Sequence, residues 1–216
     1  MRSPRLVGLV LMGALCATAA SAQEYVEFKS AQDRFGASFP TQPKITESTY
    51  TTQSGSVLPA RVYTSDSATS HFKLTVVDYS NIQAIGTEKA KACPPGSEAC
   101  SGNTAPTSST GAGYWKVDLA GAIDNAAWNL MQRDTKVTYF GWNNIDFVEG
   151  VMLSLQNADR SRTSAAIYMH ENKLYIIEGT VPKGYPEPGL FFQSLGWVDP
   201  QGNGVRYTSL YINEVH

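Results

Sequence analysis

The chain has 216 residues, with 17 basic and 19 acidic side chains and a formal net charge of −2 at pH 7. This length suits one domain with a substantial core, or at most two small domains. The mildly acidic balance argues against a nucleic-acid partner or an anionic membrane surface, because both favour basic proteins.

The first 22 residues have the three parts of a secretory signal peptide. Two arginines form a short positive start, residues 6–20 are uncharged and apolar or small, and a box of small residues ends at Ala22. We therefore expect cleavage between Ala22 and Gln23. The mature chain, residues 23–216, would form a single domain in the periplasm or outside the cell.

Two alternatives to a cleaved leader remain open. An uncleaved anchor is disfavoured because the apolar stretch has about 15 residues, short of the roughly 20 that span a bilayer as a helix. A lipoprotein with Cys16 as its first mature residue is disfavoured because Gly13 stands where such signals usually carry a bulky aliphatic side chain. No later segment is long and apolar enough to span, so we expect no transmembrane segment in the mature chain.

The N-terminal part of the mature chain shows the alternation of apolar and polar side chains that is typical of β-strands. The alternating runs lie at residues 35–39, 58–62 and 72–77. Turns are predicted between them at 54–55 and 65–70. A helix is expected next, near residues 82–92.

The two cysteines of the predicted mature chain, Cys93 and Cys100, enclose a Pro-Pro-Gly turn. An even pair in an exported chain favours a disulfide, which across so short a loop would contribute about 2–3 kcal/mol. A structural zinc site would need two more ligands nearby, and a redox-active pair usually has two intervening residues rather than six. The disulfide would close the start of a Ser-, Thr- and Gly-rich loop at 93–113, which is either functional or mobile.

Residues 118–133 are predicted to form an amphipathic helix. Four apolar residues fall on one face of such a helix: Leu119, Ile123, Ala126 and Leu130. Trp128 falls on the opposite face. Because large exposed aromatic side chains are uncommon on monomers, we expect another layer, such as the 93–113 loop, to cover Trp128. The alternative is that Trp128 belongs to an exposed binding surface.

A second strand-rich stretch follows. Strands are predicted at 135–140, 151–155, 165–169 and 174–177, with turns at 157–160 and 170–173. The short turns indicate an antiparallel meander, and the last of these strands is apolar on both faces, which predicts a central position. A short helix is expected within 186–195, a turn at 199–204 and a terminal strand at 205–212.

The segment at 139–144 combines three aromatic residues, Tyr139, Phe140 and Trp142, with two asparagines. Aromatic rings beside amides favour contact with a sugar or a protein, by stacking and hydrogen bonding. The more common arrangement is that such rings connect the end of a strand to the core, and this is what we expect. Together with Trp128, these residues are nevertheless the candidate binding surface.

Four short segments give the chain a resemblance to exported bacterial proteins of unassigned function. They are FGASFP at 35–40, VDYS at 77–80, KLYII at 173–177 and GLFFQSLGW at 189–197. The order of elements is similar to that of the Mog1/PsbP-like fold. The resemblance implies an α+β fold in which helices pack on both faces of a mostly antiparallel sheet, and a binding or accessory role more than an enzymatic one. It carries over no site residues.

Two partial motifs do not support a metal site. The segment at 170–174 begins like a zinc-protease motif, but the second ligand would be Leu174 and the segment is predicted to be a turn. The segment at 199–204 resembles a calcium loop, but its twelfth position is Leu210 instead of the bidentate glutamate that such a site needs. We therefore expect no metal and no cofactor.

Three functions are consistent with these patterns. The preferred one is a non-enzymatic periplasmic or secreted accessory or binding protein, whose partner is an unknown protein or small ligand in the cell envelope. The second is a secreted hydrolase whose site is assembled from distant residues, in which a carboxylate would have to meet His71, His170 or His216. The third is an envelope structural protein or homo-oligomer.

Overall fold

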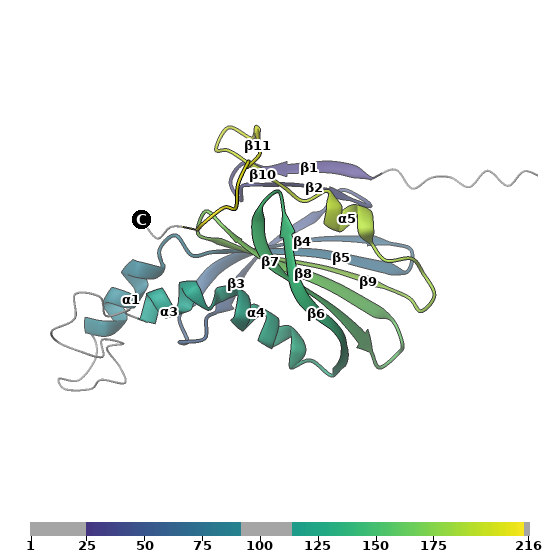
Figure 1. Cartoon of the computed structure of the whole chain (residues 1–216), viewed down its shortest axis with the longest axis horizontal. Coiled ribbons are helices and arrows are strands. Elements are labelled where there is room, and N and C mark those ends of the chain that lie inside the picture. Colours follow the sequence, from purple (N-terminus) through teal and green to yellow (C-terminus); the bar gives the residue numbers. More distant parts are fainter. Residues whose placement is uncertain (1–24, 92–113, 214–216) are drawn as a thin grey trace, which may run out of the picture.

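The computed structural model describes residues 25–91 and 114–213 (Figure 1). The predicted cleavage site after Ala22, the predicted Cys93–Cys100 disulfide and the whole of the predicted Ser/Thr-rich loop at 93–113 lie outside these residues. None of the helices in the described part of the chain is long and apolar enough to cross a membrane.

The centre of the molecule is a seven-stranded sheet in which every neighbouring pair is antiparallel. In spatial order its strands are β3 (Lys44–Thr51), β4 (Val57–Ser67), β5 (Ser70–Asp78), β9 (Lys173–Val181), β8 (Arg162–His170), β7 (Val148–Asn157) and β6 (Thr135–Ile145). Strand β9 is central and almost fully buried, as its apolar sequence predicts. The meander β7–β8–β9 is also confirmed.

A second, four-stranded antiparallel sheet packs on one face of the large sheet (Figure 1). Its order is β1 (Val26–Ser30), β2 (Phe35–Phe39), β10 (Gly196–Val198) and β11 (Gly204–Val205). The short helix α5 (Gly189–Gln193) lies on the same face. The aromatic side chains of β2 and α5, together with Trp197, fill the space between the two sheets.

The other face of the large sheet is covered by helices α1 (Ile82–Lys91), α3 (Tyr114–Ala120) and α4 (Ala122–Met131). The predicted single helix at 118–133 is divided at Gly121, where a Cβ would lie 3.1 Å from the carbonyl oxygen of Val117. The predicted apolar face is confirmed, since Leu119, Ala126 and Leu130 are buried against the sheet. The fold is therefore α+β and mostly antiparallel, with longer helices on one face and the small sheet with α5 on the other.

Strands β1 and β10 were not predicted, and three further details differ from the sequence expectation. The predicted terminal strand at 205–212 is wrong: β11 ends at Val205, and the rings of Tyr207 and Tyr211 pack on His170 instead of extending a strand. The predicted turn at 65–70 is shorter, because β4 continues to Ser67. Strand β3 was not expected, because seven of its eight residues are exposed and it shows no alternating burial.

Candidate functional site

Strand β6 forms one edge of the large sheet, and its outer edge has no strand partner among the residues the structure describes. It pairs along its inner edge with β7, with a register shift between Val137 and Tyr139 that marks a β-bulge. A bulge increases local twist and changes which face the following side chains occupy. An edge strand presents a row of backbone N–H and C=O groups with which another chain can pair.

Beyond the bulge, Phe140 and Trp142 lie on the face that carries the helices, opposite Leu153 and Val151 of β7. Leu153 is fully buried, whereas Phe140 is 50% and Trp142 62% exposed. The indole N–H of Trp142 donates a hydrogen bond to Glu149 Oε1 at 3.0 Å. The prediction that these rings connect the strand to the core is wrong, because the helix layer buries the inner strands but leaves the edge strand open.

Tyr139 lies on the opposite face of β6 and is 51% exposed. Its ring covers Gly141 two positions along the strand, where an added Cβ would stand 2.5 Å from Tyr139 Oη. A glycine at this position lets the tyrosine lie flat along the edge instead of projecting into solvent. Both faces of the edge strand therefore present aromatic surface.

Trp128 is also exposed, with 59% of its surface accessible, and the loop at 93–113 that was expected to cover it lies outside the described residues. It belongs to α4, two residues before the buried Leu130 and on the opposite side of that helix. Among the described residues no ring contact joins Trp128 to the aromatic residues of β6. The four predicted surface residues are thus all exposed, and three of them lie together on one strand.

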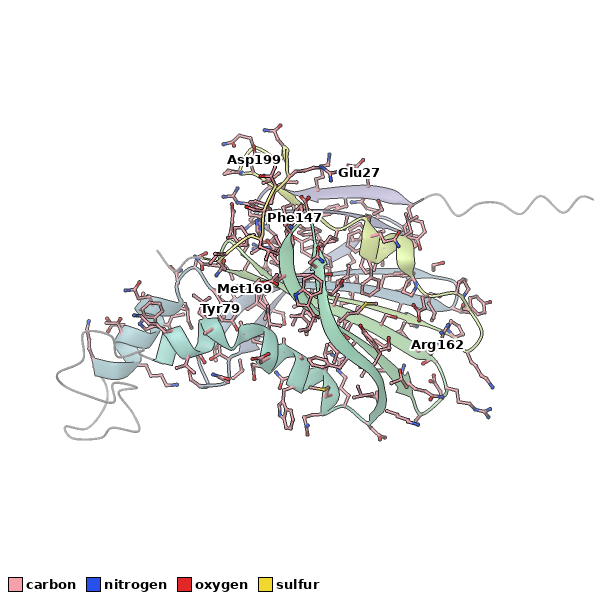
Figure 2. The ribbon with its side chains drawn as sticks, in the orientation of Figure 1. Glu27, Tyr79, Phe147, Arg162, Met169 and Asp199 are labelled. Carbon is pink, nitrogen blue, oxygen red and sulfur yellow. The ribbon has the colours of Figure 1, made fainter. Side chains whose placement is uncertain are left out.

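A cavity of about 460 Å³ lies beside β6, on the face of the large sheet that carries the small sheet. It lies over the part of β8 from Ser164 to Tyr168. Figure 2 labels Arg162, shortly before this part of the strand, and Met169, directly after it. Asn143 donates a hydrogen bond to the Tyr168 hydroxyl at 2.8 Å. Nothing in the sequence indicated this cavity, because its walls come from segments far apart in the chain.

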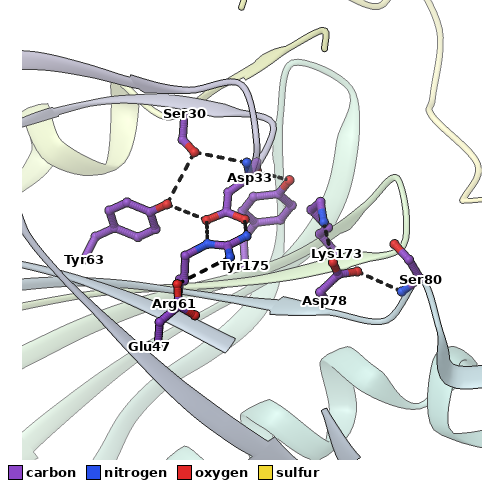
Figure 3. Close-up of polar contacts among 9 residues, drawn as sticks. All are labelled: Ser30, Asp33, Glu47, Arg61, Tyr63, Asp78, Ser80, Lys173 and Tyr175. Atoms are coloured by element: carbon purple, nitrogen blue, oxygen red, sulfur yellow. Dashed lines mark hydrogen bonds and ion pairs between the residues drawn. The ribbon is translucent and has the colours of Figure 1, made fainter. Parts of the chain in front are cut away.

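A buried polar cluster centred on Asp33 joins the small sheet to the large one (Figure 3). The Asp33 carboxylate accepts hydrogen bonds from Arg61 Nε at 2.6 Å and from the hydroxyl of Tyr63. Burial, aided by this carboxylate, raises the pKa of Tyr63 to about 12. The Tyr175 hydroxyl donates to the Asp33 carbonyl at 2.8 Å. Since Asp33 is fully engaged and 1% exposed, the cluster stabilises the fold and offers no reactive group.

The histidines that the structure describes do not form a catalytic pair. His71 lies 2.7 Å from Asp66 in the β4–β5 hairpin, but both side chains are more than 70% exposed to solvent. His170 is completely buried, stacks on Trp197 and bonds through Nε2 to the Tyr207 hydroxyl at 2.7 Å. The predicted site of a histidine-based hydrolase is therefore not assembled by these two residues, and His216 lies outside the described part.

The segments with partial metal motifs are turns, as predicted. Glu171 and Asn172 form the β8–β9 turn with positive φ values. Asp199 accepts hydrogen bonds from the backbone N–H groups of Gln201 and Asn203, so its oxygens are satisfied within its own turn. Within residues 25–91 and 114–213, no group of three or more His, Cys, Asp or Glu side chains could hold a metal ion.

No family model and no curated protein matches the chain. Among solved structures, the chain is similar to the solution structure of cyanobacterial PsbP (CyanoP) from Synechocystis sp. PCC 6803. The identity is 8% and the TM-score 0.44, and the match covers 83% of this chain and 96% of that chain. The fold class itself is defined by the strand order and helix placement described above.

Proposed function

We propose that this chain is an exported, non-enzymatic binding protein of the cell envelope that docks a protein partner along strand β6. One observation carries the proposal: Tyr139, Phe140 and Trp142 are each at least half exposed on a sheet edge that has no strand partner in the part of the chain that the structure describes. Tyrosine and tryptophan are enriched among the residues that dominate protein interfaces. The predicted leader supports the compartment.

The geometry favours a partner segment in an extended conformation. Such a segment would add a strand to β6, where main-chain hydrogen bonds supply affinity and alternate side chains supply specificity. Phe140 and Trp142 would contact one face of the added strand and Tyr139 the other. Lys136 is the only charged residue of β6, so little electrostatic repulsion opposes the approach of a neutral or acidic segment.

The test is affinity purification of the tagged mature protein from its native envelope, in quantitative comparison with variants. Phe140→Ala and Trp142→Ala should each lose a stoichiometric partner that the wild-type protein retains. Ile45→Ala, which truncates a 48% exposed apolar residue of the opposite edge strand β3, is the matched control and should retain it.

Two outcomes would overturn the proposal. A partner that survives both β6 substitutions must bind elsewhere. A wild-type protein that captures only copies of itself, with the mass of a homo-oligomer, would instead support an envelope structural role.

A further inference from the structure

The cavity beside β6 has the size and the walls of a ligand site. Its volume of about 460 Å³ falls within the roughly 300–1,000 Å³ of small-molecule pockets. One wall is the end of β6, the floor is β8, and the other wall is the segment that leads into α5. Gly179 allows this second wall to approach, because a Cβ there would lie 2.6 Å from Pro188 Cγ.

The polar groups of this cavity are predominantly uncharged. The lining includes two amide side chains and two hydroxyl groups, those of Asn143, Gln193, Ser164 and Tyr168. The rings of Tyr168 and Phe192 supply flat apolar surface beside them. Amides and hydroxyls both donate and accept hydrogen bonds, and aromatic faces pack against C–H-rich surfaces. This combination matches a ligand with many hydroxyl groups and an apolar face.

The charges of the lining argue against a strongly ionic ligand. Among the described residues that line the cavity there is no Lys, Arg or His. Each of its two carboxylates pairs with an arginine that does not line the cavity. Asp146 lies 3.9 Å from Arg206, and Glu187 lies 3.7 Å from Arg162. An anionic ligand would find no counter-charge, and a cationic ligand would compete with these arginines. Both carboxylates can still accept hydrogen bonds from ligand hydroxyls.

One donor is already positioned. The Tyr168 hydroxyl accepts the hydrogen bond from Asn143, which leaves its own proton for an acceptor in the cavity. Burial raises the pKa of Tyr168 to about 12, so the hydroxyl remains a donor at neutral pH. The ring is 3% exposed and packs edge-on against Trp197. A donor held this rigidly loses little freedom when a ligand binds.

We propose that the cavity between the β6–β7 hairpin, β8 and α5 binds a neutral saccharide, with Tyr168 and Asn143 as its central hydrogen-bonding pair. This inference is independent of the proposed docking of a protein partner, because none of the three docking residues, Tyr139, Phe140 and Trp142, lines the cavity. Either proposal can fail without the other.

The test is an NMR titration of the isotope-labelled mature protein. The neutral probes are maltotriose, cellotriose and triacetylchitotriose, and the charged probes are glucose 6-phosphate and spermidine. We expect saturable shifts of the backbone amides of residues 143–146 and 187–193 with at least one neutral trisaccharide, and none with the charged probes.

Three variants locate the binding. Gly189→Leu should abolish the shifts by filling the cavity; a Cβ at Gly189 meets only Gln193 Nε2, at 3.9 Å, so the fold should tolerate it. Tyr168→Phe removes only the hydroxyl and should weaken binding about tenfold. Tyr50→Phe is the matched control, since its hydroxyl also accepts an asparagine amide, from Asn125 on the other face of the sheet, and should leave affinity unchanged.

Three results would overturn the inference. Shifts with spermidine alone would make the cavity a cation site, and shifts with glucose 6-phosphate alone would make it an anion site. The absence of saturable shifts at these residues with all three neutral probes would exclude neutral glucans and chitin-type sugars as its ligands, and with them the saccharide assignment.

Discussion

The two edges of the large sheet are built in opposite ways. Strand β3 carries Lys44, Glu47 and several short hydroxyl side chains, and its only large exposed apolar residue is Ile45. Strand β6 carries a single charge and three exposed aromatic rings. Charged side chains on an edge disfavour pairing with other chains. The β3 edge is therefore protected against association, whereas the β6 edge is left open to it.

The contrast does not come from a difference in packing behind the two edges. Each edge strand pairs with a strand that has a fully buried leucine, Leu58 behind β3 and Leu153 behind β6. Leu58 lies opposite Tyr50, and Leu153 lies opposite Phe140. The aromatic rings of β6 are thus not required to complete the core, and their exposure needs a different explanation. Binding is the explanation that we propose.

The largest expected effect compares Leu153 with its cross-strand neighbour Phe140. Leu153→Ala should lower the free energy of unfolding by about 4 kcal/mol, within the roughly 2–5 kcal/mol typical of a leucine at full burial. Phe140→Ala should cost less than about 1 kcal/mol because its ring is half exposed. Chemical denaturation of both variants measures the difference. Equal losses would show that Phe140 is a core residue, which would remove the contrast between the edges.

The second effect concerns the ion pair behind the β3 edge. Asp33→Ala should cost about 3 kcal/mol, because it leaves Arg61 and Tyr63 without their buried partner. Glu47→Ala, on β3 itself, removes the other carboxylate near Arg61, at 3.6 Å but 74% exposed, and should cost less than about 1 kcal/mol. The comparison is made by urea unfolding. A cost for Glu47 as large as that for Asp33 would mean that the β3 edge is held by its own charges.

The third effect tests whether both edges belong to one cooperatively folded sheet. Burial, together with the charge of Arg34, lowers the pKa of His170 to about 4. In the unfolded chain His170 takes up a proton near pH 6.5, whereas in the folded chain it stays neutral until about pH 4. The free energy of unfolding therefore decreases as the pH falls from 6.5 towards 4. The slope from this group reaches about 1.4 kcal/mol per pH unit.

Urea unfolding of the wild-type protein and of His170→Gln between pH 6.5 and 4.5 measures this slope. The variant should lose it, whereas His71→Gln, at an exposed histidine, should keep it. Probes on β3 and β6 should report the same transition at each pH. A separate, pH-independent transition at β6 would mean that this edge unfolds independently of the sheet.

The smallest expected effect is on the aromatic edge itself. Trp142→Ala should change the free energy of unfolding by less than about 0.5 kcal/mol, since the ring is 62% exposed and its hydrogen bond goes to a surface glutamate. Ile45→Ala on β3 should be equally neutral. Thermal unfolding of the two variants measures both. A loss of more than about 2 kcal/mol for Trp142 alone would assign the ring a structural role.

The sequence predicted those parts of the fold in which burial alternates along the chain. Strand β2, the meander and the apolar face of α4 have regular apolar spacing, and all are confirmed. Strand β3 has no such spacing, because nearly all its residues face solvent. A strand was predicted at 205–212, but the rings of Tyr207 and Tyr211 pack on His170 instead.

The candidate site was less predictable, for a physical reason. Whether Phe140 and Trp142 are buried depends on whether β6 is an edge strand, which is decided by pairing between distant segments. The cavity over β8 likewise needs β6 and the segment before α5 to meet, with Gly179 allowing the close approach. Local patterns contain neither piece of information.

The most direct test of the contrast between the edges is site-specific photo-cross-linking in the native envelope. A photoreactive phenylalanine analogue replaces Trp142 on β6 in one variant and Ile45 on β3 in the other. We predict a discrete cross-linked partner from position 142 and none from position 45. The same product from both positions, or a product from position 45 alone, would contradict the assignment of β6 as the binding edge.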